Sequence, residues 1–256
     1  MDESRLAAAL VGPGRLWRSV AVLATTGSTN ADLAAAARAG AASGTILVSS
    51  HQSAGRGRFD RVWEAPPGAS VAVSMLLRPQ ELAEGAFALS RWPWLPLVTG
   101  LGVAEGLRRA AGVEAEVKWP NDVLIAGRKV CGILAEKVDD AAVVGVGINT
   151  LLTEEQLPVP TATSLALAGS TAATTDVLIG VLTALESAFY RWLSDEPLAP
   201  WYQGGCGSVG RQVRVQTSPT TSVVGLAEGV DAEGRLVVAT PGGRRAFAAG
   251  DVHHLR

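Results

Sequence analysis

The chain has 256 residues, of which 48% are hydrophobic and 18% charged, and its formal net charge is −2. This composition excludes a disordered chain, and the charge balance lacks the basic surplus of a general nucleic-acid binder. No run of about 20 apolar residues occurs, which argues against a membrane-spanning helix. Cys131 and Cys206 are too few for a disulfide framework or a four-cysteine metal site, and the first ten residues lack the basic-then-apolar order of a secretory signal. We therefore expect a folded, cytoplasmic protein without membrane contact.

The first half of the chain alternates between helical and strand patterns. A short N-terminal helix is expected before the break at Gly12-Pro13-Gly14. The polar run 28–30 precedes an alanine-rich stretch that ends at Gly40, which predicts a helix over 31–39. The other elements expected in this half are strands over 20–24, 45–50 and 70–77, a loop over 52–68 and a helix over 96–111.

The second half changes its texture near Gly207. Residues 174–193 repeat apolar residues at helical spacing and predict a long amphipathic helix, whereas short strands and turn signals follow from Gly207 on. We therefore predict two domains, an α+β domain over residues 1–205 and a small β-barrel or sandwich over 206–256. The strands expected in this half cover 115–119, 122–125, 130–138, 142–148, 211–216, 222–230, 235–239 and 244–248.

The most informative stretch is the Gly/Arg loop, residues 52–63, which reads QSAGRGRFDRVW. Gly55 and Gly57 allow backbone amides to turn together toward an anion. The three arginines of the loop add permanent positive charge, so that the loop suits a polyphosphate or an adenylate. Two other interpretations stay open, because a solvated basic turn has the same composition and Arg/Gly segments also bind single-stranded RNA.

Two further motifs place charge at expected strand ends. Lys118, Asn121 and Asp122 bring a cation, an amide and a carboxylate together, which could bind a nucleotide and steer a proton; the alternative is an ordinary Pro-Asn-Asp turn. Lys129 stands at the mouth of a strand with Gly132 three residues on, where a ligand could approach the backbone. The alternative for this motif is an edge strand shielded by basic residues.

Other catalytic signatures are absent or weak. The run Gly145-Val146-Gly147-Ile148-Asn149 is not a dinucleotide fingerprint, because Thr150 stands where the third glycine is needed. The sequence has no GxxxxGK[ST], HExxH or GxSxG motif, which argues against a P-loop, a zincin and an α/β-hydrolase. His253 and His254 are expected to be a surface pair. Among the tryptophans, only Trp63 and Trp119 lie within charged motifs and are candidates for stacking on a ligand.

Taken in this order and spacing, the motifs resemble the biotin–protein ligase family, in the form that lacks an N-terminal DNA-binding domain. The resemblance covers residues 27–149, and the C-terminal β segment is similar to the small barrel of the family. Because the first motif begins at Gly27, no winged helix and no DNA partner are expected. The matching segments are 27–30, Gln52 with 55–58, Trp63, 118–122, Lys129 with 132–134, and 145–149.

The resemblance implies a fold and a two-step activity. The implied fold is a mixed β-sheet catalytic domain packed with helices, like class II synthetases and biotin/lipoyl ligases, followed by an SH3-like barrel. The implied enzyme uses MgATP to convert biotin to biotinyl-AMP and pyrophosphate, and then transfers biotin to a lysine of the biotin carboxyl carrier protein, an acyl-CoA carboxylase subunit. The Mg²⁺ would enter with ATP, and no metal site of the protein itself is expected.

The resemblance also implies roles for residues of this sequence. The implied catalytic residues are Lys129, Arg58, Asp122 and Lys118, with Lys129 at the biotin carboxylate and α-phosphate and Asp122 orienting or deprotonating the incoming lysine. The implied biotin-binding residues are Ser28, Thr29, Asn30, Gln52, Arg56, Gly57, Arg58, Lys129 and Gly132. The implied nucleotide-binding residues are Gly55, Arg56, Arg58, Arg61, Trp63 near the adenine, Asn121, Gly145, Gly147 and Asn149.

The Gly/Arg loop departs from the family's pattern GRGRxGRxW at Asp60, which replaces the third glycine. An Asp adopts positive φ less readily than Gly, and it adds negative charge beside the phosphates. We expect a flexible, closing loop whose closure or adenylate retention is altered but not abolished. Release of biotinyl-AMP, compared between the parent and Asp60→Gly, tests this expectation.

Two other functions stay open. Lipoate or octanoate transfer uses the same fold, although the Arg-Arg followed by a Gly-Gly-Gly run that is common in such enzymes is absent here. A non-catalytic regulator could bind a metabolite or RNA through the Gly/Arg loop. Such a regulator would tolerate Lys129→Ala, whereas a ligase would lose adenylation by several orders of magnitude, because the cation stabilises an anionic transition state.

Overall fold

The computed structural model describes residues 1–218 and 220–255, apart from the side chain of Asp60. Its main body is a seven-stranded sheet in the order β1-β2-β3-β7-β6-β5-β4. The pair β1–β2 is parallel and every other neighbouring pair is antiparallel. The strands are β1 Ser19–Leu23, β2 Thr45–Ser49, β3 Ser70–Leu77, β4 Ala115–Lys118, β5 Asp122–Ile125, β6 Arg128–Val138 and β7 Ala141–Asn149.

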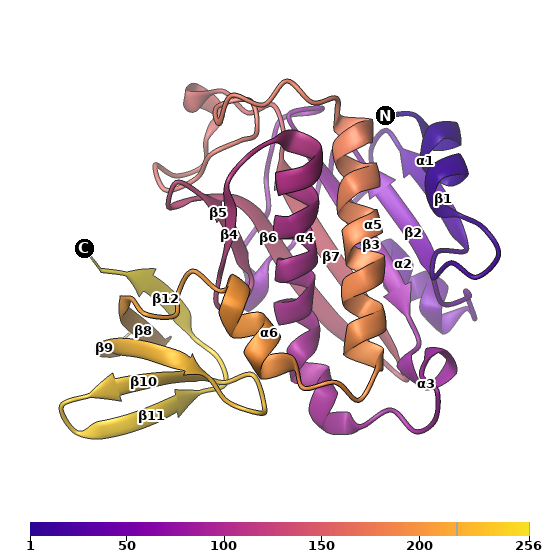
Figure 1. The fold of residues 1–256 in the computed structure, drawn as a ribbon. Helices are drawn as coiled ribbons and strands as arrows, with labels where there is room; N and C mark the ends of the chain where they lie inside the picture. Colours follow the sequence, from indigo (N-terminus) through magenta and orange to yellow (C-terminus); the bar gives the residue numbers. More distant parts are fainter. Residues whose placement is uncertain (219, 256) are drawn as a thin grey trace.

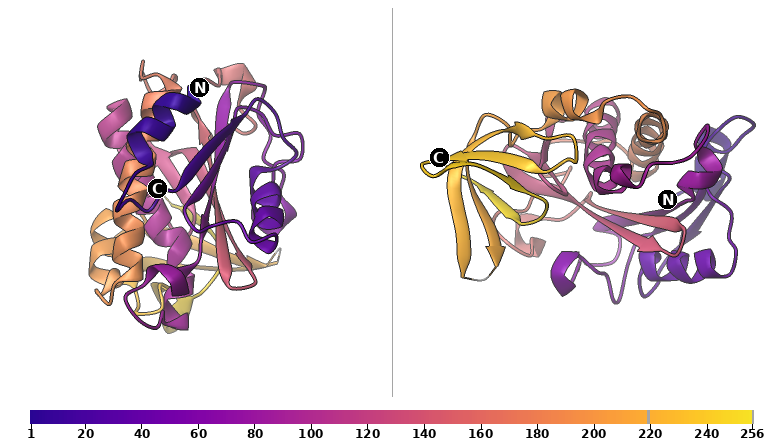
Figure 2. Two further views of the ribbon diagram at one scale, coloured as in Figure 1. Left: turned by 90° about the vertical axis from the view of Figure 1, so that its right-hand side faces the viewer. Right: turned by 90° about the horizontal axis from the view of Figure 1, so that it is seen from below.

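Helices cover both faces of this sheet (Figures 1 and 2). Helices α4 and α5 lie side by side on one face, where Gly106 permits close approach, since a Cβ there would lie 2.4 Å from the Cα of Val181. Helix α2 packs on the opposite face through Leu33 and Ala37 against Leu76 of β3. The helices are α1 Glu3–Leu10, α2 Thr29–Arg38, α3 Pro79–Leu82, α4 Leu95–Ala111, α5 Thr174–Leu193 and α6 Leu198–Gly205, with 3-10 turns at Arg58–Asp60, Leu89–Trp94 and Glu154–Gln156.

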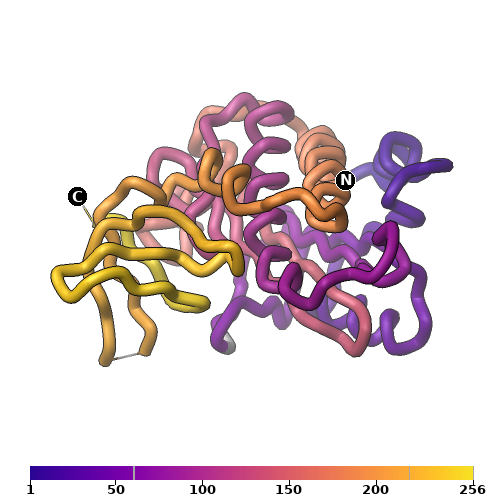
Figure 3. Tube along the Cα trace, turned by 60° about the horizontal axis from the view of Figure 1, so that its bottom comes forward, coloured from indigo at the N-terminus to yellow at the C-terminus, as the bar shows by residue number. Residues whose placement is uncertain are grey.

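The C-terminal segment forms a second, five-stranded antiparallel sheet in the order β11-β10-β9-β8-β12. Figure 3 shows this sheet at one end of the main body, beside the edge that carries β4 and β5. The indole of Trp119 donates to the carbonyl of Gly234 at 3.0 Å across the junction of the two sheets. The strands are β8 Gln212–Ser218, β9 Thr221–Val230, β10 Leu236–Thr240, β11 Gly243–Phe247 and β12 Asp251–His254.

The predicted α+β class is confirmed, and most predicted elements lie within a few residues of the observed ones. Helix α2 begins two residues before the predicted 31–39, because Ser28 caps it and accepts from the Ala31 amide at 3.4 Å. Helices α3 and α6 and strand β12 were not predicted. The domain boundary between 205 and 206 stays a prediction. No helix of the described chain is long and apolar enough to cross a bilayer.

Candidate functional site

The predicted motifs come together in one cleft, on the face of the main sheet that also carries α2. The floor is the β3-β7-β6 part of the sheet, one wall is the start of α2, and the Gly/Arg loop crosses the opening. The lining residues are Ser28, Thr29, Asn30, Gln52, Arg56, Gly57, Arg58, Arg61, Val62, Trp63, Ala72, Asn121, Asp122, Lys129, Gly132, Ile133, Leu134, Gly145, Val146, Gly147 and Asp251.

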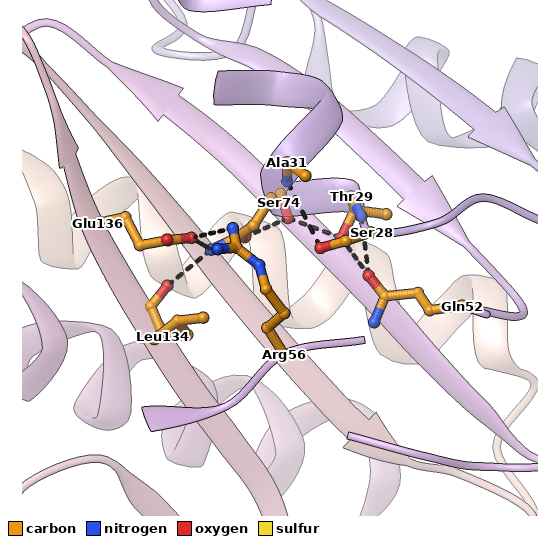
Figure 4. Close-up of polar contacts among 9 residues, drawn as sticks. Ser28, Thr29, Ala31, Gln52, Arg56, Ser74, Leu134 and Glu136 are labelled. Carbon is orange, nitrogen blue, oxygen red and sulfur yellow. Dashed lines mark hydrogen bonds and ion pairs between the residues drawn. The ribbon is translucent and has the colours of Figure 1, made fainter. Parts of the chain in front are cut away.

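The first turn of α2 supplies a fixed set of polar groups to the cleft (Figure 4). Both the amide and the hydroxyl of Thr29 donate to Oε1 of Gln52, at 2.8 and 3.0 Å. This contact leaves the Gln52 amide nitrogen free of Thr29. Ser74 lies beneath the turn on β3, with its Oγ 2.8 Å from the Thr29 hydroxyl. The three side chains are thereby oriented before any ligand enters.

Asn30 is buried and its orientation is set by three partners. The Ser74 hydroxyl donates to Oδ1 of Asn30 at 2.6 Å. The Nδ2 of Asn30 donates to the Leu134 carbonyl at 3.2 Å and to Oε2 of Glu136 at 2.7 Å. Gly145 lies directly under this amide, since a Cβ there would come within 2.2 Å of Oδ1. Gly145 is therefore required by Asn30 itself.

The Gly/Arg loop is attached to its surroundings through its arginines. Arg56 reaches Glu136 on β6, with its Nη2 3.0 Å from Oε2, as Figure 4 shows. Arg58 donates to Oδ1 of Asn121 at 2.8 Å. Arg61 pairs with Asp251 of the C-terminal sheet. Two of the arginines thus contact the main sheet side of the cleft, and the third contacts the C-terminal sheet.

The backbone of the loop differs from the expected anion nest. The amide of Gly57 donates to the carbonyl of Arg61 at 2.7 Å, so this amide closes a turn and is not presented to a ligand. The left-handed position of the turn is Phe59, with φ 56° and ψ 42°. Asp60, whose effect on the loop was predicted above, has its side chain outside the described residues.

Trp63 occupies the glycine-lined floor that the sequence suggested was open to a ligand. A Cβ on Gly147 would lie 2.6 Å from the Trp63 ring, and one on Gly132 would lie 3.0 Å from it. Gly132 and Gly147 face each other in the β6–β7 register, so together they form a flat seat for the indole. The Trp63 Nε1 is buried and has no hydrogen-bond partner among the described residues.

Asp122 joins the two motif lysines. Its Oδ1 lies 2.6 Å from the Lys129 ammonium and its Oδ2 lies 2.8 Å from the Lys118 ammonium. Burial alone would raise the pKa of Asp122, but the two lysines oppose burial and hold the pKa below its ordinary value. The carboxylate is therefore ionised at neutral pH, with a cation on each oxygen.

The backbone around Lys129 is fixed by the segment 161–163, which no motif of the sequence indicated. The Lys129 amide donates to the Thr161 carbonyl at 2.7 Å, and the Thr163 amide donates to the Lys129 carbonyl at 2.8 Å. Asn149 is buried outside the cleft lining, and its Nδ2 donates to the Thr163 carbonyl at 2.9 Å. Asn149 thus supports the segment that holds Lys129.

Two other predicted residues lie beside the cleft and not in its lining. Lys118 contacts the cleft through Asp122. Gly55 packs against the backbone of Trp63, where a Cβ would lie 2.3 Å from the carbonyl oxygen. All other predicted site residues line the cleft.

Three expectations from the sequence were wrong. Trp119 is only 1% exposed and belongs to the core between the sheets, so it does not stack on a ligand in the cleft. The edge-strand alternative for Lys129 fails, because β6 lies between β5 and β7. His254 is not a surface residue like His253, since its Nε2 lies 2.8 Å from the buried Ser208 hydroxyl.

Sequence reasoning missed Ser74, Glu136 and Asp251, which contact the predicted site residues directly. The first two carried a usable signal. Glu136 follows Gly132 at even spacing on one strand, and side chains of such residues share a face of a sheet. Ser74 interrupts the apolar run of residues 71–77 within β3. Asp251 carried no such signal, because the strand that holds it was not predicted.

Comparisons with known proteins identify the family of this chain. Residues 22–149 match the Biotin/lipoate A/B protein ligase family, and residues 209–255 match the Biotin protein ligase C terminal domain. The chain is 39% identical to a biotin–[acetyl-CoA-carboxylase] ligase of Mycobacterium tuberculosis, over 100% of this chain and 96% of that protein. It is 34% identical to the ligase of the same name from Paracoccus denitrificans, over 90% of this chain and 98% of that protein.

A solved structure supports the same assignment. The structure of a biotin protein ligase from Aquifex aeolicus in complex with biotin and ATP superimposes with a TM-score of 0.77 and 27% sequence identity. The superposition covers 94% of this chain and 100% of that one. The folds and the sequences therefore agree over nearly the whole length, and the chain belongs to the biotin protein ligase family.

Proposed function

We propose that this protein is a biotin–protein ligase that works in two steps. In the first step a carboxylate oxygen of biotin attacks the α-phosphorus of ATP, pyrophosphate leaves, and biotinyl-AMP forms. In the second step a lysine amine of a carrier protein attacks the acyl carbon, AMP leaves, and an amide bond forms. The first step brings two anions together, and the second develops negative charge on the acyl oxygen and on the departing AMP. Neither step needs a nucleophile from the enzyme, so positioning and positive charge are the main requirements.

One observation carries the proposal: the arginines of the Gly/Arg loop and the lysine at the mouth of β6 line the same cleft. Arg58 reaches across to Asn121 at 2.8 Å, and Asn121 directly precedes the Asp122 that holds Lys129. A carboxylate and a phosphate placed between the loop and β6 would meet cations from both sides. Such preorganised charge stabilises the transition state of phosphoryl transfer.

The start of α2 suits the polar ring of biotin. The amide and hydroxyl groups offered here have orientations already set by hydrogen bonds within the protein, and they belong to Ser28, Thr29, Asn30 and Gln52. Arg56 and Gly57 lie at the loop end of the same cleft, and Gly132 lies on its floor. We assign the ureido ring to the α2 end and the carboxylate to the end near Lys129.

The nucleotide is assigned to the part of the cleft between Lys129 and the Gly/Arg loop. Arg58, Arg61 and Asn121 line this part, and the buried Trp63 Nε1 lacks a partner that an acceptor on a ligand could provide. Gly145, Gly147 and Gly55 act indirectly in this scheme, by making room for Asn30 and Trp63. Asn149 acts through the segment that fixes the Lys129 backbone.

Lys129 and Asp122 divide the chemistry between them. The Lys129 ammonium neutralises charge at the carboxylate and the α-phosphate, and Asp122 aims that ammonium. Asp122 becomes a better acceptor for a proton of the incoming carrier lysine when one of its two lysine partners moves away, because the two cations together hold its pKa low. Lys118 is the partner that can stay and keep the carboxylate in place.

We propose that the carrier is a biotin carboxyl carrier protein of an acyl-CoA carboxylase, because the two relatives described above are named for acetyl-CoA carboxylase. We also propose that Mg²⁺ enters with ATP. In the described part of the chain no group of three or more His, Cys, Asp or Glu side chains is placed to hold a metal ion. In this proposal the triphosphate brings its own cation to the cleft.

The test is exchange of labelled pyrophosphate into ATP, with biotin and lipoate supplied in separate reactions. We expect exchange that depends on biotin, and Lys129→Ala should lower its rate by about 100-fold or more. Lys137→Ala is the matched control, since this lysine lies on the same strand, outside the cleft lining, near the ring of Trp92. Exchange that needs lipoate and ignores biotin would assign the other acyl substrate. No exchange with either acid would favour a non-catalytic regulator.

A further inference from the structure

The loop and the C-terminal sheet meet at one charged pair. Arg61 donates from Nη1 to Oδ1 of Asp251 at 3.3 Å, and its Nη2 contacts Oδ2, so that the guanidinium engages both carboxylate oxygens. Among the hydrogen bonds and ion pairs of the described residues, this is the one that joins the Gly/Arg loop to the C-terminal sheet. Both side chains line the cleft.

We propose that Asp251 is a positioning residue, which holds the Gly/Arg loop across the opening of the cleft by anchoring Arg61. Asp251 is the first residue of β12 and pairs with Gln216 of β8, so its backbone belongs to a sheet and not to a flexible turn. The loop's other two arginines bond to the main sheet side, at Glu136 and Asn121. Asp251 therefore completes the attachment from the opposite side.

The pair is suited to holding a movable segment. Its two side chains are 62% and 29% exposed, and ion pairs with this degree of exposure are weak and sensitive to salt. A weak, bidentate attachment favours one position of the loop without preventing ligand entry. The next fixed point of the loop after Arg61 is Trp63 on its glycine seat, two residues further along the chain.

The inference rests on the proposed function for its consequence, which concerns the reactive intermediate. A loop held over the cleft slows the escape of biotinyl-AMP and keeps water from the anhydride. Asp251 itself need not touch the substrates for this effect. Losing the Asp251 carboxylate should therefore speed release of biotinyl-AMP more than it changes the KM for biotin.

The first test needs no substrate. Phe59 is exposed at the loop, and chymotrypsin cleavage after it, identified by mass spectrometry, reports how often the loop leaves its position. We expect Asp251→Asn to speed this cleavage by about two- to fivefold in the ligand-free protein. Raising the salt concentration should raise the cleavage rate of the parent toward that of Asp251→Asn, because salt screens the Arg61–Asp251 pair.

A control variant and a double-mutant cycle distinguish loss of the anchor from damage to the C-terminal sheet. Glu228→Gln removes another arginine-bound carboxylate of the C-terminal sheet, the partner of Arg244, and should leave loop cleavage unchanged. In an Arg61→Gln background, Asp251→Asn should have no further effect on cleavage, since the anchor is already lost. The proposal is overturned if Asp251→Asn is cleaved at the parent rate. It is also overturned if adding Asp251→Asn to Arg61→Gln speeds cleavage as much as Asp251→Asn does in the parent.

The second test measures biotinyl-AMP release from the preloaded enzyme. Asp251→Asn should release it faster by the same two- to fivefold factor, about that expected for an exposed ion pair. If the parent makes no biotinyl-AMP, the proposed function fails while the cleavage result still decides whether Asp251 anchors the loop. If cleavage changes and release does not, the anchor exists but does not retain the intermediate, and the inference is wrong at that step.

Discussion

At the scale of single residues, Asp122 is the point where charge is concentrated. Replacing it with Asn keeps the shape but leaves two ammonium groups without the anion that lies between them. We expect Asp122→Asn to lower biotin-dependent pyrophosphate exchange by about 10- to 100-fold, because the charged hydrogen bond that aims Lys129 contributes about 1.5–3 kcal/mol. Exchange rates at saturating ATP and biotin measure the loss.

Glu105 provides a matched control for Asp122. Its carboxylate also holds two cations, Arg108 and Arg109, but on the surface of α4 and away from the cleft. Glu105→Gln should leave the exchange rate within experimental error of the parent, since surface pairs of this kind contribute little. If both variants lose exchange activity to a similar extent, the loss comes from removing any carboxylate that pairs with two cations, and not from misplacing the Lys129 ammonium.

At the scale of elements, two glycines on neighbouring strands prepare a flat surface for one indole. Gly147→Ala would place a methyl group within 2.6 Å of the Trp63 ring, so the ring and the end of the Gly/Arg loop must shift. Overpacking of this kind costs about 1–3 kcal/mol. We expect the KM values for biotin and ATP to rise by about tenfold or more, with unchanged far-UV circular dichroism.

Gly204→Ala tests whether any added methyl group has this effect. Gly204 lies in α6, where a Cβ would meet nothing within 4 Å, so the substitution should leave both KM values unchanged. Pairing Gly147→Ala with Trp63→Phe gives the smaller ring more room and should recover part of the affinity. KM values for Gly147→Ala equal to those of the parent would show that Trp63 does not need its seat.

The same elements show what the sequence could predict. Helix α5 was predicted closely because its apolar residues recur at the helical period, and β3 because a short apolar run rich in valine is typical of a buried strand. Strand β12 was missed, since four residues that include two histidines give no such pattern. Helix α6 was missed because its short sequence contains a proline and two glycines, which are poor helix formers.

The residues of the site divide in the same way, into those that a local sequence pattern reveals and those that it does not. Motif residues such as Lys129 and Asn30 were predicted because their chemistry is visible within a few neighbouring positions. The partner Asp251 depends on strand pairing and on how two sheets meet, which no local pattern encodes, whereas Glu136 shares a strand and a face with Gly132 and could have been found. The role of the floor glycines was also hidden, since the sequence cannot tell a seat for Trp63 from a gap for a ligand.

At the scale of the whole molecule, the two sheets are joined by a polar junction that contains His254. The Ser208 hydroxyl lies 2.8 Å from Nε2 of His254 and accepts from the Trp119 amide at 3.1 Å. Burial lowers the pKa of His254 to about 4, and the nearby Arg211 and Lys118 add to the shift. Between pH 6.5 and about pH 4 the folded protein therefore keeps this imidazole neutral, whereas an unfolded chain would protonate it.

This depressed pKa makes stability depend on pH in a defined direction. An unfolded histidine titrates near 6.5, so its contribution is fully present above that pH and is lost as pH falls toward 4. Between pH 7 and pH 5 we expect the free energy of unfolding to fall by about 1 kcal/mol more in the parent than in His254→Gln, after allowance for solvent screening of a half-buried group. Urea denaturation at the two pH values measures it, and His253→Gln, a change at the exposed neighbour, should behave like the parent. If His254→Gln loses as much stability as the parent over this interval, protonation of the junction does not destabilise the fold.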